Sequence, residues 1–144
     1  MYESYTRQAL PEKYYRELLG TALCVFNSNN AFVIENILNS DDLGKYNWYE
    51  LMDKESGQLK KEVKKTITAK SDEEIGKLFF DIVEMRNRII HSFQITNDAG
   101  KQALATKTKI EKGNKQFEIT EEYLMKFIKL NEQLSDKLHT FRGY

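Results

Sequence analysis

The chain has 144 residues, 40% of them hydrophobic, and its eight Tyr, eight Phe and one Trp supply enough apolar surface for a folded core rather than a disordered chain. The 22 basic and 22 acidic residues cancel, which excludes a molecule drawn as a whole to nucleic acid or to an anionic membrane. Without a signal-peptide pattern, a membrane-spanning run or a second cysteine to pair with Cys24, we expect a cytoplasmic protein with no membrane partner.

Residues 11–39 are predicted to form one long helix. Pro11 suits a first helical turn, and apolar residues recur at steps of three and four after it. The line expected to be buried is Leu19, Leu23, Phe26, Asn30, Val33 and Ile37. The polar cluster at 27–30 could instead be a loop that ends the helix, but the unbroken phase favours one continuous helix. Cys24 is expected in the core.

Two shorter segments follow. Residues 40–54 predict a connection that packs on the core through Trp48, Tyr49, Leu51 and Met52. Residues 55–70 predict a surface helix, with a thin apolar stripe of Leu59, Val63 and Ile67 among many lysines. The basic side of this helix is either a solvated face or a phosphate-binding face, and its candidate ligands are Lys60, Lys61 and Lys64.

Residues 71–93 predict the central helix. Ser71 and Glu74 have the spacing of a capping box, which marks a helix start. The apolar stripe that follows is Ile75, Leu78, Phe79, Ile82, Met85, Ile89 and Phe93. We therefore expect this helix to be central to the core.

The remainder of the chain predicts a small β-hairpin and a last helix. Residues alternate from Leu104 to Ile110, a turn follows at 112–114, and alternation resumes at Phe117 and Ile119. The hairpin carries further lysines, including Lys107 and Lys109, as a second basic surface. Thr120 is a plausible N-cap for the last helix. The expected fold is a mainly α, single-domain bundle of four to five helices over residues 1–144, with the hairpin before the last helix.

The end of the central helix crowds Arg86, Asn87, Arg88 and His91 beside the apolar stripe. On an ideal helix Asn87 and His91 lie about 40° apart, and the long Arg86 side chain reaches the same region. A purely structural interpretation is also available, because Glu84 and Arg88 are spaced as a helical ion pair and a histidine near a helix end can cap carbonyls. Spacing alone does not decide between these interpretations.

The run from Arg86 to His91 resembles the R-x(4–6)-H motif of the HEPN superfamily, including the polar residue after the arginine. That family places the motif toward the end of a long helix in an all-α bundle. The resemblance implies that residues 11–39 and 71–93 are its two long antiparallel core helices. It covers most of the chain, and the hairpin is an elaboration of the family pattern.

The resemblance implies a metal-independent endoribonuclease that needs no cofactor and acts as a homodimer, in a toxin–antitoxin, phage-defence or stress-response system. By analogy Arg86 would hold the scissile phosphate, His91 would transfer protons and Asn87 would orient phosphate or imidazole. Arg88 and the two lysine-rich surfaces would contact the RNA, and an antitoxin protein is a further expected partner. The chain's other histidine, His139, is expected on the surface.

Two alternatives remain. The superfamily also contains catalytically inactive modules, so the same cleft could bind a nucleotide, RNA or a protein partner. In the third interpretation, Arg86 and His91 only stabilise a helix end in an interaction protein. The residues predict no metal site, because neither a cysteine pair nor a histidine cluster has zinc-binding spacing.

Overall fold

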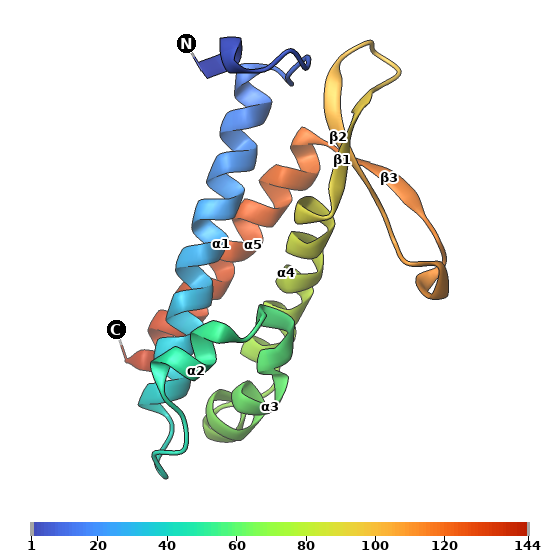
Figure 1. The fold of residues 1–144 in the computed structure, drawn as a ribbon. Helices are drawn as coiled ribbons and strands as arrows, with labels where there is room; N and C mark the ends of the chain where they lie inside the picture. The colour runs from blue at the N-terminus through green and yellow to red at the C-terminus, as the bar shows by residue number, and fades with distance from the viewer. Residues whose placement is uncertain (1, 144) are drawn as a thin grey trace.

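The computed structural model describes residues 2–143, in which five α-helices pack around one apolar core and a three-stranded sheet lies at one end of the bundle (Figure 1). The helices are α1 (Lys13–Asn39), α2 (Trp48–Asp53), α3 (Lys60–Val63), α4 (Glu74–Ile90) and α5 (Glu121–Arg142). The strands are β1 (Ser92–Thr96), β2 (Gln102–Lys107) and β3 (Gln116–Ile119). The mainly α fold with a small sheet before the last helix is therefore confirmed. Among the described residues, no helix combines the length and apolarity that crossing a bilayer requires.

Helix α1 is continuous through the Asn cluster, as predicted, but its buried line lies slightly off the expected one. The buried residues are Tyr15, Leu18, Ala22, Phe26, Asn29, Val33, Ile34, Asn36 and Ile37. Asn29 therefore takes the buried position that was expected for Asn30, which is partly buried. The core assignment of Cys24 is wrong, because the side chain is exposed. Cys24 lies two residues after the buried Ala22 and two before the buried Phe26. A step of two residues turns about 200° around a helix, so Cys24 faces away from both.

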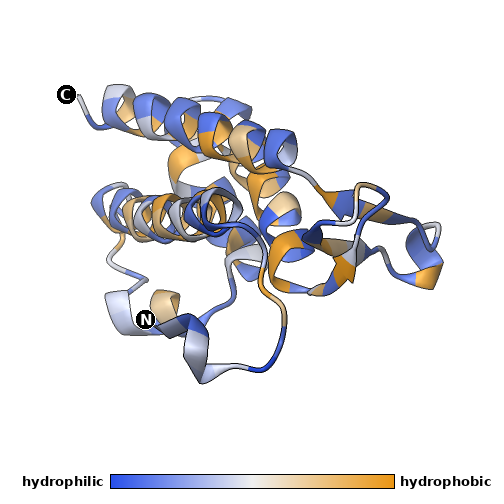
Figure 2. Cartoon of the chain, turned by 90° about the horizontal axis from the view of Figure 1, so that it is seen from above, coloured by the Kyte–Doolittle hydropathy of each residue, from blue (hydrophilic) through white to orange (hydrophobic). Residues whose placement is uncertain are grey.

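Helix α5 is the common packing partner of α1 and α4 (Figure 1). It runs alongside α1, with Phe26 against Phe127 at a ring-centroid distance of 6.2 Å. The Asn29 amide donates to the main-chain oxygen of Asn131 at 2.8 Å and to its Oδ1 at 3.0 Å, so the buried polar groups satisfy one another. The helices turn their hydrophobic residues toward one another (Figure 2). The expected pairing of residues 11–39 with 71–93 is thus secondary to the contact that each helix makes with α5.

The lysine-rich segment forms a composite helix rather than a uniform one. A 3-10 turn, η2 (Ser56–Leu59), leads into α3, and a π-helical turn, η3 (Lys64–Thr68), follows. The predicted stripe is confirmed, because Leu59, Val63 and Ile67 are all buried. The Thr66 hydroxyl donates to the Glu62 carbonyl at 2.6 Å, and such a bond to the carbonyl four residues earlier often bends a helix.

Helix α4 begins at Glu74, and the predicted capping box is wrong. Asp72 Oδ1 accepts the Glu74 amide at 2.8 Å and takes the role that was expected for Ser71. The Ser71 hydroxyl instead donates to the Ile67 carbonyl at 2.7 Å. The chain enters α4 almost directly from the preceding helical segment, so a nearby carbonyl competes for the serine.

The predicted hairpin is present as β2 and β3, which pair antiparallel with Leu104 opposite Ile119. The turn between them holds Gly113 at φ 101° and Asn114 at φ 51°, the left-handed conformations that these residue types adopt most readily. Strand β1 was not predicted, and it pairs antiparallel with the other edge of β2. Phe93 therefore lies in a strand with 44% of its surface exposed, so the predicted stripe ends too late.

Candidate active site

The R-x(4)-H residues lie where α4 gives way to β1. Arg86 and Asn87 are on the last turn and a half of the helix, and His91 is its C-cap, with φ −98° and ψ 43°. The His91 amide donates to the Asn87 carbonyl at 3.0 Å. The Ser92 hydroxyl donates to the Ile89 carbonyl at 2.6 Å, so a second helix-end carbonyl is satisfied. The end of the helix thus fixes the backbone that carries the histidine.

Arg86, Asn87 and His91 all line one cleft of about 320 Å³. Its opposite side is built from α1, through Phe26, Asn27 and Asn30, and from the segment between α2 and η2, through Lys54, Glu55 and Ser56. The Ser56 hydroxyl donates to Asn30 Oδ1 at 2.6 Å, and this hydrogen bond joins the α2–η2 segment to α1. The three residues of the predicted motif are therefore brought together beside a concave surface.

The Arg86 guanidinium lies over the Phe26 ring, with its central carbon 4.8 Å from the ring centroid. This is cation–π geometry, and the ring holds the side chain without using any of its hydrogen-bond donors. Arg86 Nε is buried and has no hydrogen-bond partner. Burial lowers the pKa of Arg86 and the nearby Glu55 carboxylate raises it. Because an arginine remains protonated in proteins, the cleft holds a permanent positive charge whose Nε donor has no hydrogen-bond partner.

His91 is exposed at the mouth of the cleft, in contrast to the half-buried Arg86. Its main-chain oxygen accepts the Thr106 hydroxyl at 3.4 Å, which is a long contact between the helix end and β2. The other histidine, His139, is exposed on α5, where it packs against the Phe32 ring at 4.6 Å and donates through Nδ1 to the Ser135 carbonyl at 2.7 Å. His139 does not line the cleft. One chain therefore contributes one imidazole to this site.

Arg88 is used within the fold and does not line the cleft. Its Nη1 donates to the Lys107 carbonyl at 2.7 Å, which ties α4 to the end of β2. Its Nε lies 3.5 Å from Glu84 Oε1, so the predicted helical ion pair is present, although without hydrogen-bond geometry. The side chain is only 14% exposed. These contacts place Arg88 beside the motif but direct it toward the sheet.

The candidate RNA-binding lysines also lie outside the cleft. Lys60 and Lys64 line a separate groove with Phe80, whose ring centroid is 5.6 Å from the Lys60 ammonium. Lys61 is exposed on α3, and Lys107 and Lys109 lie at the end of β2 and in the turn that follows. The only lysine that lines the cleft within residues 2–143 is Lys54. Sequence reasoning missed it, because a single lysine after a short helix belongs to no periodic pattern.

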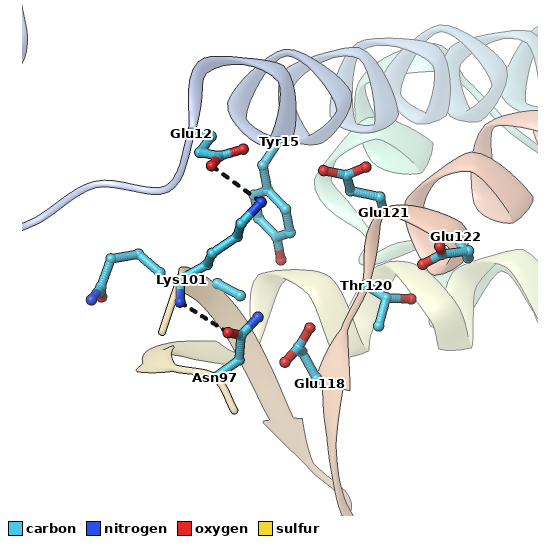
Figure 3. Close-up of a pocket in the computed structure, with 10 residues that line it drawn as sticks. Glu12, Tyr15, Asn97, Lys101, Glu118, Thr120, Glu121 and Glu122 are labelled. Atoms are coloured by element: carbon cyan, nitrogen blue, oxygen red, sulfur yellow. Dashed lines mark hydrogen bonds and ion pairs between the residues drawn. The ribbon is translucent and has the colours of Figure 1, made fainter. Parts of the chain in front are cut away.

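A second pocket, of about 200 Å³, lies between the start of α1, the β1–β2 turn and the start of α5 (Figure 3). It gathers Glu12, Glu118, Glu121 and Glu122, and Lys101 pairs with Glu12 at 3.3 Å. The Tyr15 hydroxyl at its wall donates to the Ile119 carbonyl and accepts the Leu104 amide, and burial raises the pKa of this tyrosine. Four carboxylates repel a phosphate, so this pocket does not suit a nucleic acid.

In the part of the chain that the structure describes, no group of three or more His, Cys, Asp or Glu side chains is arranged to hold a metal ion. Comparison with known proteins found no match among protein-family models, curated proteins or solved structures. The cleft therefore has two features that bear on its function, its geometry and the R-x(4)-H motif that lines it.

Proposed function

We propose that this protein is a HEPN-type endoribonuclease that acts without a metal ion, through the cleft at the end of α4. The observation that carries the proposal is the convergence of Arg86, Asn87 and His91 on one concave surface, where Arg86 keeps a buried donor unused. Because the Phe26 ring holds the guanidinium without using its donors, a phosphodiester in the cleft could accept hydrogen bonds from the outer nitrogens of Arg86. Arginine suits this role because its planar fork matches the oxygens of a phosphate.

The proposed reaction is attack of a ribose 2′-hydroxyl on the adjacent phosphorus. A neutral imidazole takes the 2′-hydroxyl proton, the O2′–P bond forms, and the P–O5′ bond breaks. A protonated imidazole gives its proton to the leaving 5′-oxygen, which leaves a 2′,3′-cyclic phosphate and a free 5′-hydroxyl. Arg86 stabilises the charge that develops on the pentacoordinate phosphate, and Asn87 orients the phosphate or the imidazole.

The reaction needs a base and an acid, whereas one chain brings a single imidazole to the cleft. A twofold homodimer with its axis close to His91 supplies the second group, because residues at a twofold axis meet their own symmetry copies. Ile90 lines the cleft beside His91 and is 46% exposed, which gives the mouth of the cleft an apolar margin, and Phe93 in the following strand is 44% exposed. Such a margin suits contact with a second copy.

A second candidate function is a catalytically inactive module that binds a nucleotide, RNA or a protein through the same cleft. The observation that favours it is Glu55, which also lines the cleft and is close enough to Arg86 to affect its pKa. A carboxylate there opposes the approach of any phosphate, so among these ligands it favours a protein partner. The cellular setting that we propose, by the HEPN resemblance, is a toxin–antitoxin, phage-defence or stress-response system in the cytoplasm, with an antitoxin protein as inhibitor.

The deciding experiment is incubation of the purified protein with single-stranded RNA in excess EDTA. Arg86→Ala and His91→Ala test the site, and Arg7→Ala and His139→Gln are matched controls, because both residues are exposed and lie outside the cleft. Cleavage that persists with EDTA, is retained by both controls and is lost in both site variants supports the ribonuclease. Binding of RNA without cleavage supports the inactive module.

A further inference from the structure

Lys54 and Glu62 form an ion pair in which the lysine reaches the cleft and the carboxylate is buried behind it. Lys54 Nζ lies 2.8 Å from Glu62 Oε1. The Glu62 side chain is 6% exposed, whereas the Lys54 side chain is 41% exposed and lines the same cleft as Arg86. The pair therefore presents its positive end to the cleft and keeps its negative end in the interior.

The backbone on both sides of this pair is fixed. Lys54 is the C-cap of α2, and its amide donates to the Leu51 carbonyl at 3.2 Å. Glu62 lies on α3, and its carbonyl accepts the Thr66 hydroxyl where the π-helical turn begins. The two ends of the ion pair are thus attached to different helices, and the lysine ammonium is held at a defined point.

A contribution to folding stability does not by itself explain why Lys54 and Glu62 form a partly buried ion pair. Glu62 Oε2 is buried and has no hydrogen-bond partner, so the carboxylate is only half satisfied. A buried ion pair is often no more stable than an apolar pair of the same size, because both charges must be removed from water. An ammonium has three donors, and Glu62 occupies one of them. The remaining donors are available to an acceptor in the cleft.

The pair of Lys70 and Asp42 provides an internal comparison. Its distance is also 2.8 Å and its lysine side chain is also 41% exposed, but Asp42 is 74% exposed and the pair does not line the cleft at α4. The hydrogen bond to Glu62 raises the pKa of Lys54, so the ammonium is charged at neutral pH. Lys54 therefore differs from an ordinary surface lysine in its buried partner and in its place at the cleft.

We propose that Lys54 is a second phosphate-binding cation of this cleft and that Glu62 is the positioning residue that holds it there. The ligand is the backbone of single-stranded RNA, with one phosphate at Arg86 and a neighbouring phosphate at Lys54. This inference rests on the proposed function for its choice of RNA, but its test measures binding separately from cleavage.

The test uses a short single-stranded 2′-O-methyl RNA, which lacks the attacking hydroxyl, so that fluorescence anisotropy reports binding alone. The principal variant combines Lys54→Met with Glu62→Gln, which removes the cation without leaving a buried carboxylate unpaired. Lys54→Arg keeps the cation. The matched control combines Lys70→Met with Asp42→Asn and removes the comparable pair outside the cleft.

The logarithm of the association constant falls as the logarithm of the salt concentration rises. Loss of one phosphate contact to a single strand should make this slope less steep by about 0.7, which corresponds to about fivefold weaker binding near 0.1 M salt. We expect this for the Lys54/Glu62 variant, and we expect Lys54→Arg and the Lys70/Asp42 control to remain within about twofold of the wild type. An unchanged slope, an equal loss in the control, or no binding by the wild type would overturn the proposal.

Glu62→Gln with Lys54 retained tests the positioning role. Because the lysine charge remains but its position is no longer fixed, the salt slope should stay at the wild-type value, while KM for RNA cleavage rises by about threefold to fivefold and kcat changes little. A destabilised fold would not give this split, and circular dichroism verifies folding. Cleavage by the wild type with an unaffected Lys54/Glu62 variant would refute this inference alone. Failure of the wild type to cleave would refute the ribonuclease, and anisotropy would still decide the role of Lys54.

Discussion

Arg86 is half-buried and charged, and in the described part of the chain no carboxylate lies within ion-pair distance of it. Its orientation depends instead on the Phe26 ring, which accepts the flat guanidinium in a way that a compact ammonium does not reproduce. This dependence links a core residue of α1 to the chemistry at the end of α4. The specific chemical type of residue 86 should therefore matter as much as its charge.

For this reason Arg86→Lys should lower the single-turnover rate of RNA cleavage by about a hundredfold, the size of effect expected when an aligned donor is lost from a charged transition state. The free energy of unfolding, measured in urea, should change by less than about 1 kcal/mol, because the lysine stem still covers Phe26. Lys60→Arg, which changes a lysine outside the cleft, is the control. A wild-type rate in Arg86→Lys would show that the guanidinium geometry has no role.

Glu62 predicts how stability depends on pH. Burial alone raises the pKa of this carboxyl, but the hydrogen bond from Lys54, the main chain and the charge of Lys61 bring it below its ordinary value of 4.5. The unfolded chain then binds the proton first as pH falls, so the stabilisation by Glu62 is present above about pH 4.5 and disappears at lower pH. Glu62→Gln should therefore be less stable than wild type at neutral pH, and this difference should shrink below about pH 4.5. Urea titrations at several pH values measure it, and a gap that widens in acid would contradict the assignment.

Helix α1 contains a glycine in its interior where the structure gives no reason for one. A methyl group on Gly20 would meet nothing within 4 Å, and its φ is helical. Gly20→Ala should raise the free energy of unfolding by about 0.5–1 kcal/mol, because alanine loses less backbone entropy in a helix. Gly76 in α4 is the comparison, since a methyl there would lie 3.4 Å from atoms of Val63 and Thr68. Thermal unfolding of both variants should show a gain at Gly20 and a smaller gain or a loss at Gly76.

The helices could be predicted because their burial repeats along the chain, whereas strand β1 could not. Phe93 follows Ile89 by four residues and continues the phase of α4, so the local pattern indicates more helix. The chain leaves the helix at His91 because Ser92–Thr96 finds hydrogen-bond partners on β2, a contact made across the β1–β2 turn. Tertiary pairing overrides local periodicity in this case.

In the candidate site too, some residues could be placed from local sequence and others only from tertiary contacts. Arg86, Asn87 and His91 could be placed together from their spacing on one helix. Phe26 and Lys54 reach the cleft from α1 and from the end of α2, and no local pattern encodes that meeting. Arg88 could be paired with Glu84 by spacing, but its bond to the Lys107 carbonyl depends on where the sheet lies.

Considered as a whole, the molecule has no net charge to attract RNA, so binding depends on the few cations of the cleft. A twofold dimer would double those cations in one place and would bring two copies of His91 together. Loss of the dimer should then abolish catalysis, whereas loss of a catalytic side chain can leave the dimer intact. Ile90→Glu, which places a charge on the apolar margin, should give a folded monomer by light scattering that does not cleave RNA.

A mixing experiment tests this coupling directly. If each active site needs His91 from both subunits, only dimers of two wild-type chains cleave RNA, and activity follows the square of the wild-type fraction. An equal mixture of wild type and His91→Ala, after subunit exchange, should therefore retain about a quarter of the activity of pure wild type at the same total concentration. Sites confined to single chains would retain about half, since each wild-type subunit would work independently. Mixing with His139→Gln should leave the activity unchanged, because that histidine lies outside the cleft. A linear dependence on the wild-type fraction would separate catalysis from dimerisation and would leave the second proton-transfer group to be found within one chain.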